Sequence, residues 1–212
     1  MNIIEKEKLI VIFRGVKKEQ MPKLLPVLYR AGVRIIEIAY NHRDSKTIET
    51  TCELIKTAKE IMGDKMMVGA GTVLNKKMVV EAYKAGAEFI FSPNVNTDVI
   101  KLTKELGLIS IPGAYTPTEC MTAYDAGADV IKMFPITLND VDYIKNIMRP
   151  LSHVPFICVG GVSVEAIPAY MEAGAIGVGT GISILKPELL EAEKYDEIEK
   201  LAKAHVDVLK QY

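Results

Sequence analysis

Cysteine and histidine are scarce in this chain, with three residues of each among 212. The cysteines are far apart and odd in number, so they indicate neither a disulfide framework nor a zinc site. The histidines also lack the spacing of metal ligands. We therefore expect no metal ion and no other cofactor, with the thiols buried in a reducing compartment. The six residues are Cys52, Cys120, Cys158, His42, His153 and His205.

The chain also lacks an excess of charge and a long apolar run. Its 26 basic and 27 acidic residues leave a formal net charge of -1, which gives no general attraction to nucleic acid or to an anionic membrane. The first eight residues include four charged ones, and no later run approaches the length of a membrane span. These features predict a cytoplasmic protein whose partner is a small molecule.

No linker rich in serine or glycine divides the chain, so we expect residues 1–212 to form a single domain. Short runs rich in Val, Ile and Phe alternate with longer segments of helical period, and a long amphipathic segment follows Pro187. This alternation predicts a parallel sheet covered by helices. The predicted strands are Leu9–Arg14, Val33–Tyr40, Met66–Val73, Glu88–Pro93, Ile109–Gly113, Val130–Phe134, Phe156–Gly160 and Ile176–Gly179.

A short repeat supports this arrangement, because four helical segments close on Ala-Gly directly before a strand, at Gly32, Gly86, Gly127 and Gly174. Glycine readily takes the left-handed conformation that ends a helix. About eight strand–helix units in roughly 200 residues favour an α/β protein with the (β/α)8 TIM barrel fold. The alternative is an open Rossmann-like sheet, but the segment 14–17 after the first strand lacks its glycine fingerprint.

Two isolated charges lie inside apolar strands, Lys132 within Val130–Ile136 and Glu37 within Ile35–Ala39. A buried lysine becomes a nucleophile near neutral pH if its pKa falls about 3 units, which corresponds to roughly 4 kcal/mol and is within reach of burial. A carboxylate in such a strand is either paired or held as an acid and base. The alternatives are a structural Glu37–Lys132 ion pair and a lysine head that reaches water. Two such charges near strand ends favour an active site.

Glycine clusters mark the ends of the last two predicted strands, where barrels commonly bind a phosphoryl group. Gly160 and Gly161 end the seventh strand, and the stretch 177–181 ends the eighth. The stretch Gly69–Thr72 after the third strand offers amides and a hydroxyl that suit a substrate carboxylate, and Arg14 could add a guanidinium. Turn glycines without a ligand and a surface arginine remain the plainer alternatives.

Seven stretches at the predicted strand ends together resemble one enzyme family. They read FRG (13–15), IEI (36–38), VGAGTV (68–73), SPN (92–94), IPG (111–113), IKMFP (131–135) and VGGV (159–162). The combination resembles the 2-keto-3-deoxy-6-phosphogluconate (KDPG) aldolase family through nearly the whole chain. The resemblance implies a class I aldolase on a (β/α)8 barrel, usually a homotrimer, that needs no metal and serves carbohydrate metabolism of the Entner–Doudoroff type.

The same resemblance implies roles for individual residues. Lys132 matches the Schiff-base lysine and Glu37 the general acid and base of an enzyme that cleaves a phosphorylated 2-keto-3-deoxy acid to pyruvate and glyceraldehyde 3-phosphate. Thr72 and the preceding loop amides, that of Gly71 included, match the groups that hold the pyruvyl carboxylate, to which Arg14 could add its guanidinium as above. The remaining matches are Pro93 and Phe134 as apolar walls, and Gly160, Gly161, Gly179 and Thr180 as the phosphate cradle.

The chain departs from the gluconate type at Asn41, where an arginine is common, and at Val159, where threonine is common. Both resemble the branch that acts on 2-keto-3-deoxy-6-phosphogalactonate (KDPGal), the C4 epimer, since a lost hydrogen bond can decide between epimers. Arg43 could instead replace the missing arginine. Tyr40 and the loop 113–116 match neither branch, which leaves open 4-hydroxy-2-oxoglutarate, a substrate without phosphate.

Two further classes of protein stay open on the sequence, because one fold supports many chemistries. A phosphosugar isomerase or epimerase would need a proton-shuttling pair or a metal. A non-catalytic barrel that binds phosphate would keep the glycine cradle alone, but such a chain has no reason to retain Glu37 and Lys132 as two costly buried charges.

Overall fold

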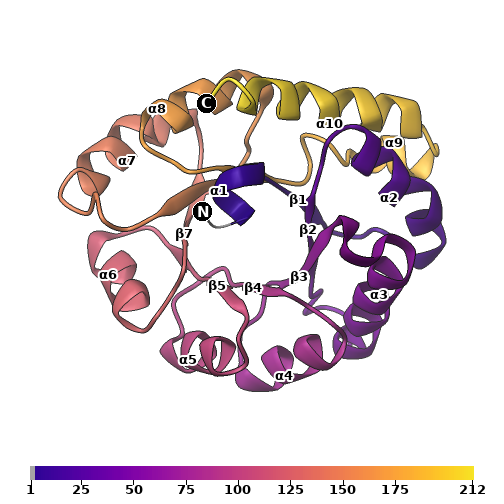
Figure 1. Ribbon diagram of the computed structural model, residues 1–212, viewed down its shortest axis with the longest axis horizontal. Coiled ribbons are helices and arrows are strands. Elements are labelled where there is room, and N and C mark those ends of the chain that lie inside the picture. Colours follow the sequence, from indigo (N-terminus) through magenta and orange to yellow (C-terminus); the bar gives the residue numbers. More distant parts are fainter. Residues whose placement is uncertain (1–2) are drawn as a thin grey trace.

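Residues 3–212, the part of the chain that the computed structural model describes, form a parallel barrel surrounded by helices (Figure 1). Its strands are β1 (Leu9–Phe13), β2 (Ile35–Ala39), β3 (Met67–Gly71), β4 (Phe89–Phe91), β5 (Ile109–Ile111), β6 (Gly113–Ala114), β7 (Ile131–Ile136), β8 (Phe156–Gly160) and β9 (Val178–Thr180). Its helices are α1 (Ile3–Glu7), α2 (Met21–Arg30), α3 (Thr47–Met62), α4 (Lys76–Lys84), α5 (Thr97–Glu105), α6 (Pro117–Asp125), α7 (Val141–Met148), α8 (Ile167–Glu172), α9 (Pro187–Glu191) and α10 (Tyr195–Leu209).

The predicted fold class is confirmed, with one change in the strand count. The sheet runs β5-β4-β3-β2-β1-β9-β8-β7-β6, and the predicted strand Ile109–Gly113 is divided into β5 and β6 at Pro112. Proline has no N–H to continue a ladder. β5 therefore pairs with β4, whereas β6 pairs with β7, and the Pro112 carbonyl accepts a bond from the Lys132 amide at 2.9 Å. The two pieces share one place in the ring of a (β/α)8 barrel.

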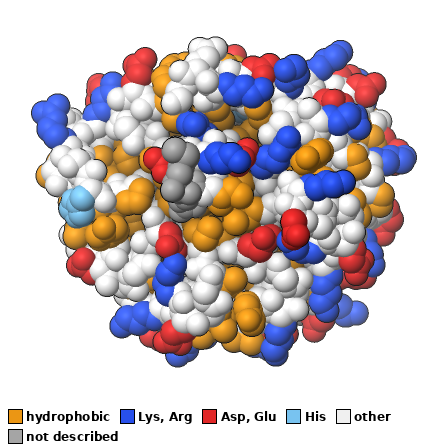
Figure 2. Space-filling model, viewed as in Figure 1, with side chains coloured by type: hydrophobic (Ala, Val, Ile, Leu, Met, Phe, Trp, Pro, Cys, Tyr) orange, Lys and Arg blue, Asp and Glu red, His pale blue; other side chains and the backbone are white. Residues whose placement is uncertain are grey.

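Side chains alternate between two apolar layers because neighbouring strand residues face opposite sides. On β1, Ile10 points into the barrel interior, whereas Leu9 and Val11 pack under the helices. Ile4 of α1 belongs to the interior cluster, and α1 lies across the centre of the ring in Figure 1. On the face that Figure 2 shows, cationic and anionic side chains are interspersed, as the balanced composition predicts.

The Ala-Gly repeats end helices as predicted. Gly32, Gly86, Gly127 and Gly174 have φ of 100, 95, 102 and 95°, in the left-handed region that glycine tolerates. After each of these glycines the chain reaches the next strand within four residues.

The long amphipathic segment predicted after Pro187 is helical, but it is divided into two helices. α9 ends at Glu191, and Glu193 then takes a left-handed conformation with φ of 50°, before α10 begins at Tyr195. The break lets α9 bury Leu189 and Leu190 while α10 packs beside α2 and α8. None of the helices within residues 3–212 is both long and apolar enough to span a bilayer. The domain predicted for residues 1–212 begins with Met1 and Asn2, which lie outside the described residues.

Candidate active site

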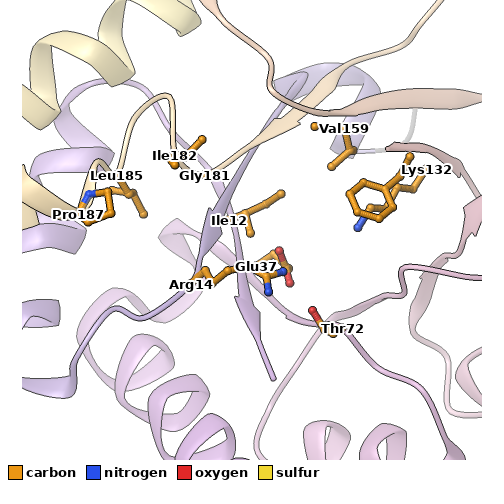
Figure 3. A pocket seen from close by; sticks show the side chains of 12 residues that line it. Ile12, Arg14, Glu37, Thr72, Lys132, Val159, Gly181, Ile182, Leu185 and Pro187 are labelled. Carbon is orange, nitrogen blue, oxygen red and sulfur yellow. The ribbon is translucent and has the colours of Figure 1, made fainter. Parts of the chain in front are cut away.

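A cavity of about 630 Å³ opens at the carboxyl ends of the strands, where barrel enzymes place their chemistry (Figure 3). We call it the central cavity. Its walls come from residues within or after β1, β2, β3, β7, β8 and β9. They are Ile12, Arg14, Glu37, Thr72, Lys132, Phe134, Val159, Gly160, Gly181, Ile182, Leu185 and Pro187.

Lys132 lies in the central cavity with its side chain almost wholly shielded, since the residue is only 7% exposed. Its Nζ stands 4.2 Å from the ring centroids of both Phe91 and Phe134, so aromatic faces surround the amine. Among residues 3–212, no carboxylate lies within 4.0 Å of Lys132, and the alternative of a tight Glu37–Lys132 ion pair is therefore not realised.

Burial lowers the pKa of Lys132 to about 8, because water no longer solvates the ammonium. The negative charge of Glu37 opposes this shift, and the positive charge of Arg14 adds to it. A fraction of the amine is therefore free at neutral pH. The cationic form also has a desolvation penalty, which the aromatic rings only partly offset.

Glu37 points into the same cavity from the middle of β2 and is 2% exposed. Two glycines of β3 make room for large side chains, Gly71 for Glu37 and Gly69 for Phe89. A β-carbon at Gly71 would collide with Oε1 of Glu37, and one at Gly69 would collide with the Phe89 ring. Only glycine at position 71 therefore allows the Glu37 carboxyl group to approach β3 this closely.

Burial raises the pKa of Glu37 to about 7, while the charges of Lys132 and then Arg14 pull it down. Two groups whose pKa values move toward each other near neutrality can share one proton between them. The central cavity therefore holds a nucleophilic amine and a carboxyl group that can both give and take a proton.

Two groups at the cavity wall suit an anion. Thr72 follows β3 with φ of 58°, and within residues 3–212 neither its N–H nor its hydroxyl has a hydrogen-bond partner. Arg14 follows β1 and is exposed, with no carboxylate of the described chain within 4.0 Å. Their unpaired donors can bind a carboxylate at the edge of the cavity.

The structure brings half of the predicted site residues into the central cavity: Arg14, Glu37, Thr72, Lys132, Phe134 and Gly160. The others lie elsewhere, and their roles stay predictions. Thr180 is fully buried, and its hydroxyl donates to the Val162 carbonyl at 3.2 Å. Gly179 packs against the Val159 side chain, and Gly71 lies against Glu37.

Three further predicted residues, Gly161, Pro93 and Asn41, also stand outside the wall of the central cavity. Gly161 is exposed, with open space at its α-carbon. The Pro93 backbone lies so close to Gly113 that a β-carbon there would meet the Pro93 carbonyl at 2.5 Å. Asn41 lines a neighbouring hollow of about 490 Å³ that includes Arg14 and Arg43.

Sequence reasoning missed four apolar residues of the wall: Ile12, Ile182, Leu185 and Pro187. Ile12 could have been found, since the alternation on β1 directs it inward with Ile10. Ile182 carries no such signal, because a loop has no periodicity, and it is 67% exposed at the mouth. The part of the cavity after β8 and β9, where the sequence predicts a phosphate group, is therefore more apolar than its glycines indicate.

The chain matches known proteins over most of its length. A family model described as KDPG and KHG aldolase matches residues 1–201. The 2-dehydro-3-deoxy-6-phosphogalactonate aldolase of Escherichia coli (strain K12) is 31% identical over 179 residues, 84% of each chain. The KHG/KDPG aldolase of the same strain is 33% identical over 195 residues, 90% of this chain and 87% of the relative. A solved structure described as native KDPGal structure is 29% identical with a TM-score of 0.85, covering 96% of this chain and 94% of that chain.

Proposed function

Because this chain belongs to the KDPG and KHG aldolase family, we propose that it cleaves a 2-keto-3-deoxy-6-phospho sugar acid to pyruvate and glyceraldehyde 3-phosphate through a Schiff base. The observation that carries the proposal is the state of Lys132. This amine is buried among aromatic rings, has no carboxylate within 4.0 Å in residues 3–212 and shares a cavity with Glu37. An isolated, desolvated lysine beside a proton-transfer group is the arrangement that imine chemistry requires.

In the first step the lone pair of Lys132 Nζ attacks the C2 carbonyl carbon of the substrate, and a proton passes from nitrogen to the former carbonyl oxygen. Glu37 in its protonated form, which its raised pKa of about 7 keeps populated near neutral pH, then donates its proton to the C2 hydroxyl, which leaves as water. The products of this step are a protonated imine on Lys132 and a Glu37 carboxylate. The positive imine nitrogen is now an electron sink.

In the second step the Glu37 carboxylate takes the proton of the C4 hydroxyl. The C3–C4 bond breaks, its electron pair moves toward the imine nitrogen, and C4 leaves as the aldehyde carbon of glyceraldehyde 3-phosphate. Glu37 then returns its proton to C3 of the enamine on Lys132. Water adds to the resulting protonated imine, Glu37 takes up the proton that this hydrolysis releases, and pyruvate leaves. The free amine of Lys132 and the protonated Glu37 are thereby regenerated.

Binding roles follow from the walls of the central cavity. Thr72 and Arg14 would hold the pyruvyl carboxylate with their unpaired donors, and Phe134 would cover the pyruvyl carbons. We assign Pro93 a second apolar wall, and Gly71 the space for Glu37 beside the bound acid.

At the distal end we propose that Gly160, Gly161, Gly179 and Thr180 form the phosphate cradle through backbone amides. Of these, Gly160 lines the central cavity. We further propose the galactonate epimer as the preferred substrate, because Asn41 and Val159 stand where gluconate-type members commonly carry arginine and threonine.

A second candidate substrate is 4-hydroxy-2-oxoglutarate, which would give pyruvate and glyoxylate at the same Lys132. Its C5 carboxylate needs a smaller polar cradle than a phosphate group does, which fits a wall that is apolar at Ile182, Leu185 and Pro187 and a Thr180 hydroxyl that is engaged by Val162. The two candidates differ only beyond C4, so the proposed chemistry is common to both.

We also propose that the protein acts in the cytoplasm as a homotrimer without metal or other cofactor, in sugar-acid breakdown of the Entner–Doudoroff type. Family resemblance supports these points. Light scattering at working concentration should give the mass of three chains, and a monomer mass would contradict the trimer. Activity should survive a chelator, whereas a metal-dependent isomerase or epimerase would lose it.

The proposal is tested by pyruvate release from gluconate-type and galactonate-type substrates and from 4-hydroxy-2-oxoglutarate, compared as kcat/KM. The Lys132→Met variant should keep the fold and release no pyruvate from any of them. Turnover at the wild-type rate in this variant would refute the Schiff-base mechanism. Stabilisation by phosphorylated ligands without any pyruvate would instead indicate a non-catalytic barrel.

A further inference from the structure

The turn after β3 holds Thr72 in a strained conformation at the edge of the central cavity. Its φ of 58° lies in the left-handed region, which a β-branched residue rarely adopts. The same turn separates the Thr72 N–H from the ladder, so that within residues 3–212 this N–H and the hydroxyl both lack a partner. Such strain persists only where the surroundings hold the backbone in place.

The surroundings hold this turn through its carbonyl groups. Four consecutive carbonyl oxygens, from Gly71 to Leu74, each accept a hydrogen bond from one of the two neighbouring loops, the loop after β2 or the loop after β4. The donor and acceptor pairs are Tyr40 N to Gly71 at 2.8 Å, His42 Nε2 to Thr72 at 2.9 Å, Ser92 Oγ to Val73 at 2.8 Å and Asn96 Nδ2 to Leu74 at 3.2 Å.

His42 provides the bond that acts directly on the cavity wall. Of the four carbonyl groups, only that of Thr72 belongs to a residue lining the central cavity. Since a carbonyl oxygen accepts, Nε2 of His42 carries the hydrogen in this contact. His42 itself is exposed on the loop after β2 and does not line the cavity, so it acts on a ligand only through Thr72.

We propose that His42 is a positioning residue for the substrate carboxylate. By donating to the Thr72 carbonyl it fixes the left-handed turn, and the turn presents the unpaired Thr72 N–H and hydroxyl to the same anion. Figure 3 shows the Thr72 side chain at the cavity wall. A carboxylate that accepts two fixed donors binds more tightly than one that must first order them. The inference rests on the proposed function in taking a 2-keto acid as the ligand.

Pyruvate is the probe, and two readouts follow its binding in the full-length protein. One is the pyruvate concentration that half-saturates borohydride trapping on Lys132. The other is the rise in melting temperature with pyruvate, which requires binding but no imine. His42→Ala should raise the half-saturating concentration roughly tenfold, the effect of one well-placed hydrogen bond, and leave the trapped plateau unchanged.

Two further variants separate positioning from simple support of the fold. His42→Gln restores an amide donor and should recover most of the affinity for pyruvate. Ser92→Ala removes the matched bond to Val73, one residue farther along, where Ser92 is 3% exposed. It should lower the melting temperature more than His42→Ala does, while the affinity for pyruvate stays near that of the wild type.

The inference is overturned if His42→Ala leaves both readouts unchanged, if His42→Gln is as weak as His42→Ala, or if Ser92→Ala weakens pyruvate equally. A wild type that is stabilised by pyruvate in a His42-dependent way but never trapped would refute the Schiff base and keep the positioning role. A wild type that pyruvate does not stabilise would refute the positioning role.

Discussion

Replacing Lys132 by methionine should abolish turnover and at the same time make the protein more stable at pH 7. The ammonium is buried, and its pKa falls from 10.5 to about 8 on folding. Each pKa unit corresponds to about 1.4 kcal/mol, so the charged lysine costs the folded state about 3 kcal/mol at pH 7. Methionine has a similar length and fills the space between Phe91 and Phe134 without a charge.

Two effects reduce this gain. The substitution removes the cation–π contacts, which contribute about 0.5–2 kcal/mol. It also removes the positive charge that favours the Glu37 carboxylate, but Glu37 can respond by staying protonated, since burial already raises its pKa to about 7. We expect a net stabilisation of about 1–2 kcal/mol at pH 7, or a few degrees in Tm for a domain of this size.

The dependence on pH identifies the cause. Because the folded pKa of Lys132 is lowered, the unfolded chain binds more protons between about pH 8 and 10.5, and the wild type recovers stability as the pH rises through that window. The advantage of Lys132→Met should therefore be full below pH 8 and disappear toward pH 10.5. Calorimetric melts at pH 7 and pH 10 measure the full difference and one that has lost most of its size. A variant that is less stable than the wild type at pH 7, or a difference that does not change with pH, would refute the reasoning.

Three other changes test separate parts of the site. Glu37→Gln should lower kcat by about 10²–10⁴-fold, while pyruvate is still trapped on Lys132. The wild-type plot of kcat/KM against pH should be bell-shaped with limbs near pH 7 and 8, and the variant's plot should only rise with pH. If the variant kept the falling alkaline limb, that limb would belong to a group other than Glu37. Gly71→Ala should lose most activity, because its β-carbon meets Oε1 of Glu37. Gly15→Ala is the control for backbone effects, since a β-carbon at Gly15 meets open space although its φ is 78°. Equal activities of the two variants would contradict the packing argument. Ile182→Ser should raise kcat/KM for phosphorylated substrates relative to 4-hydroxy-2-oxoglutarate, with Ile182→Val as the control, and an unchanged ratio would remove Ile182 from the distal wall.

Charged residues inside apolar strands made much of the site predictable. Lys132 and Glu37 are each the single charged residue of a strand whose other residues are apolar. The strands of a barrel direct such residues to a common interior. Alternating strand and helix signals likewise gave the order of the barrel. These features are local in the sequence and follow directly from burial and periodicity.

Other features depend on packing between distant segments. The division of β5 from β6 requires knowing that β4 and β7 lie on either side of Pro112. Two hydrogen bonds join segments that are distant in the sequence, one from the Thr180 hydroxyl to Val162 and one from His42 to Thr72. In the sequence, nothing distinguishes these residues from other residues near the ends of helices and strands. Ile182 is an exposed apolar residue in a loop, and composition gives such a residue no expected position.

Reductive trapping of pyruvate on the protein tests the central claim most directly. The protein is incubated with pyruvate and borohydride, and the modified residue is located by mass spectrometry of its peptides. We expect one reduced pyruvyl group per chain, carried by Lys132 and missing from Lys132→Met. The absence of any adduct under saturating pyruvate, or an adduct on a different lysine, would contradict the assignment of Lys132 as the imine-forming residue.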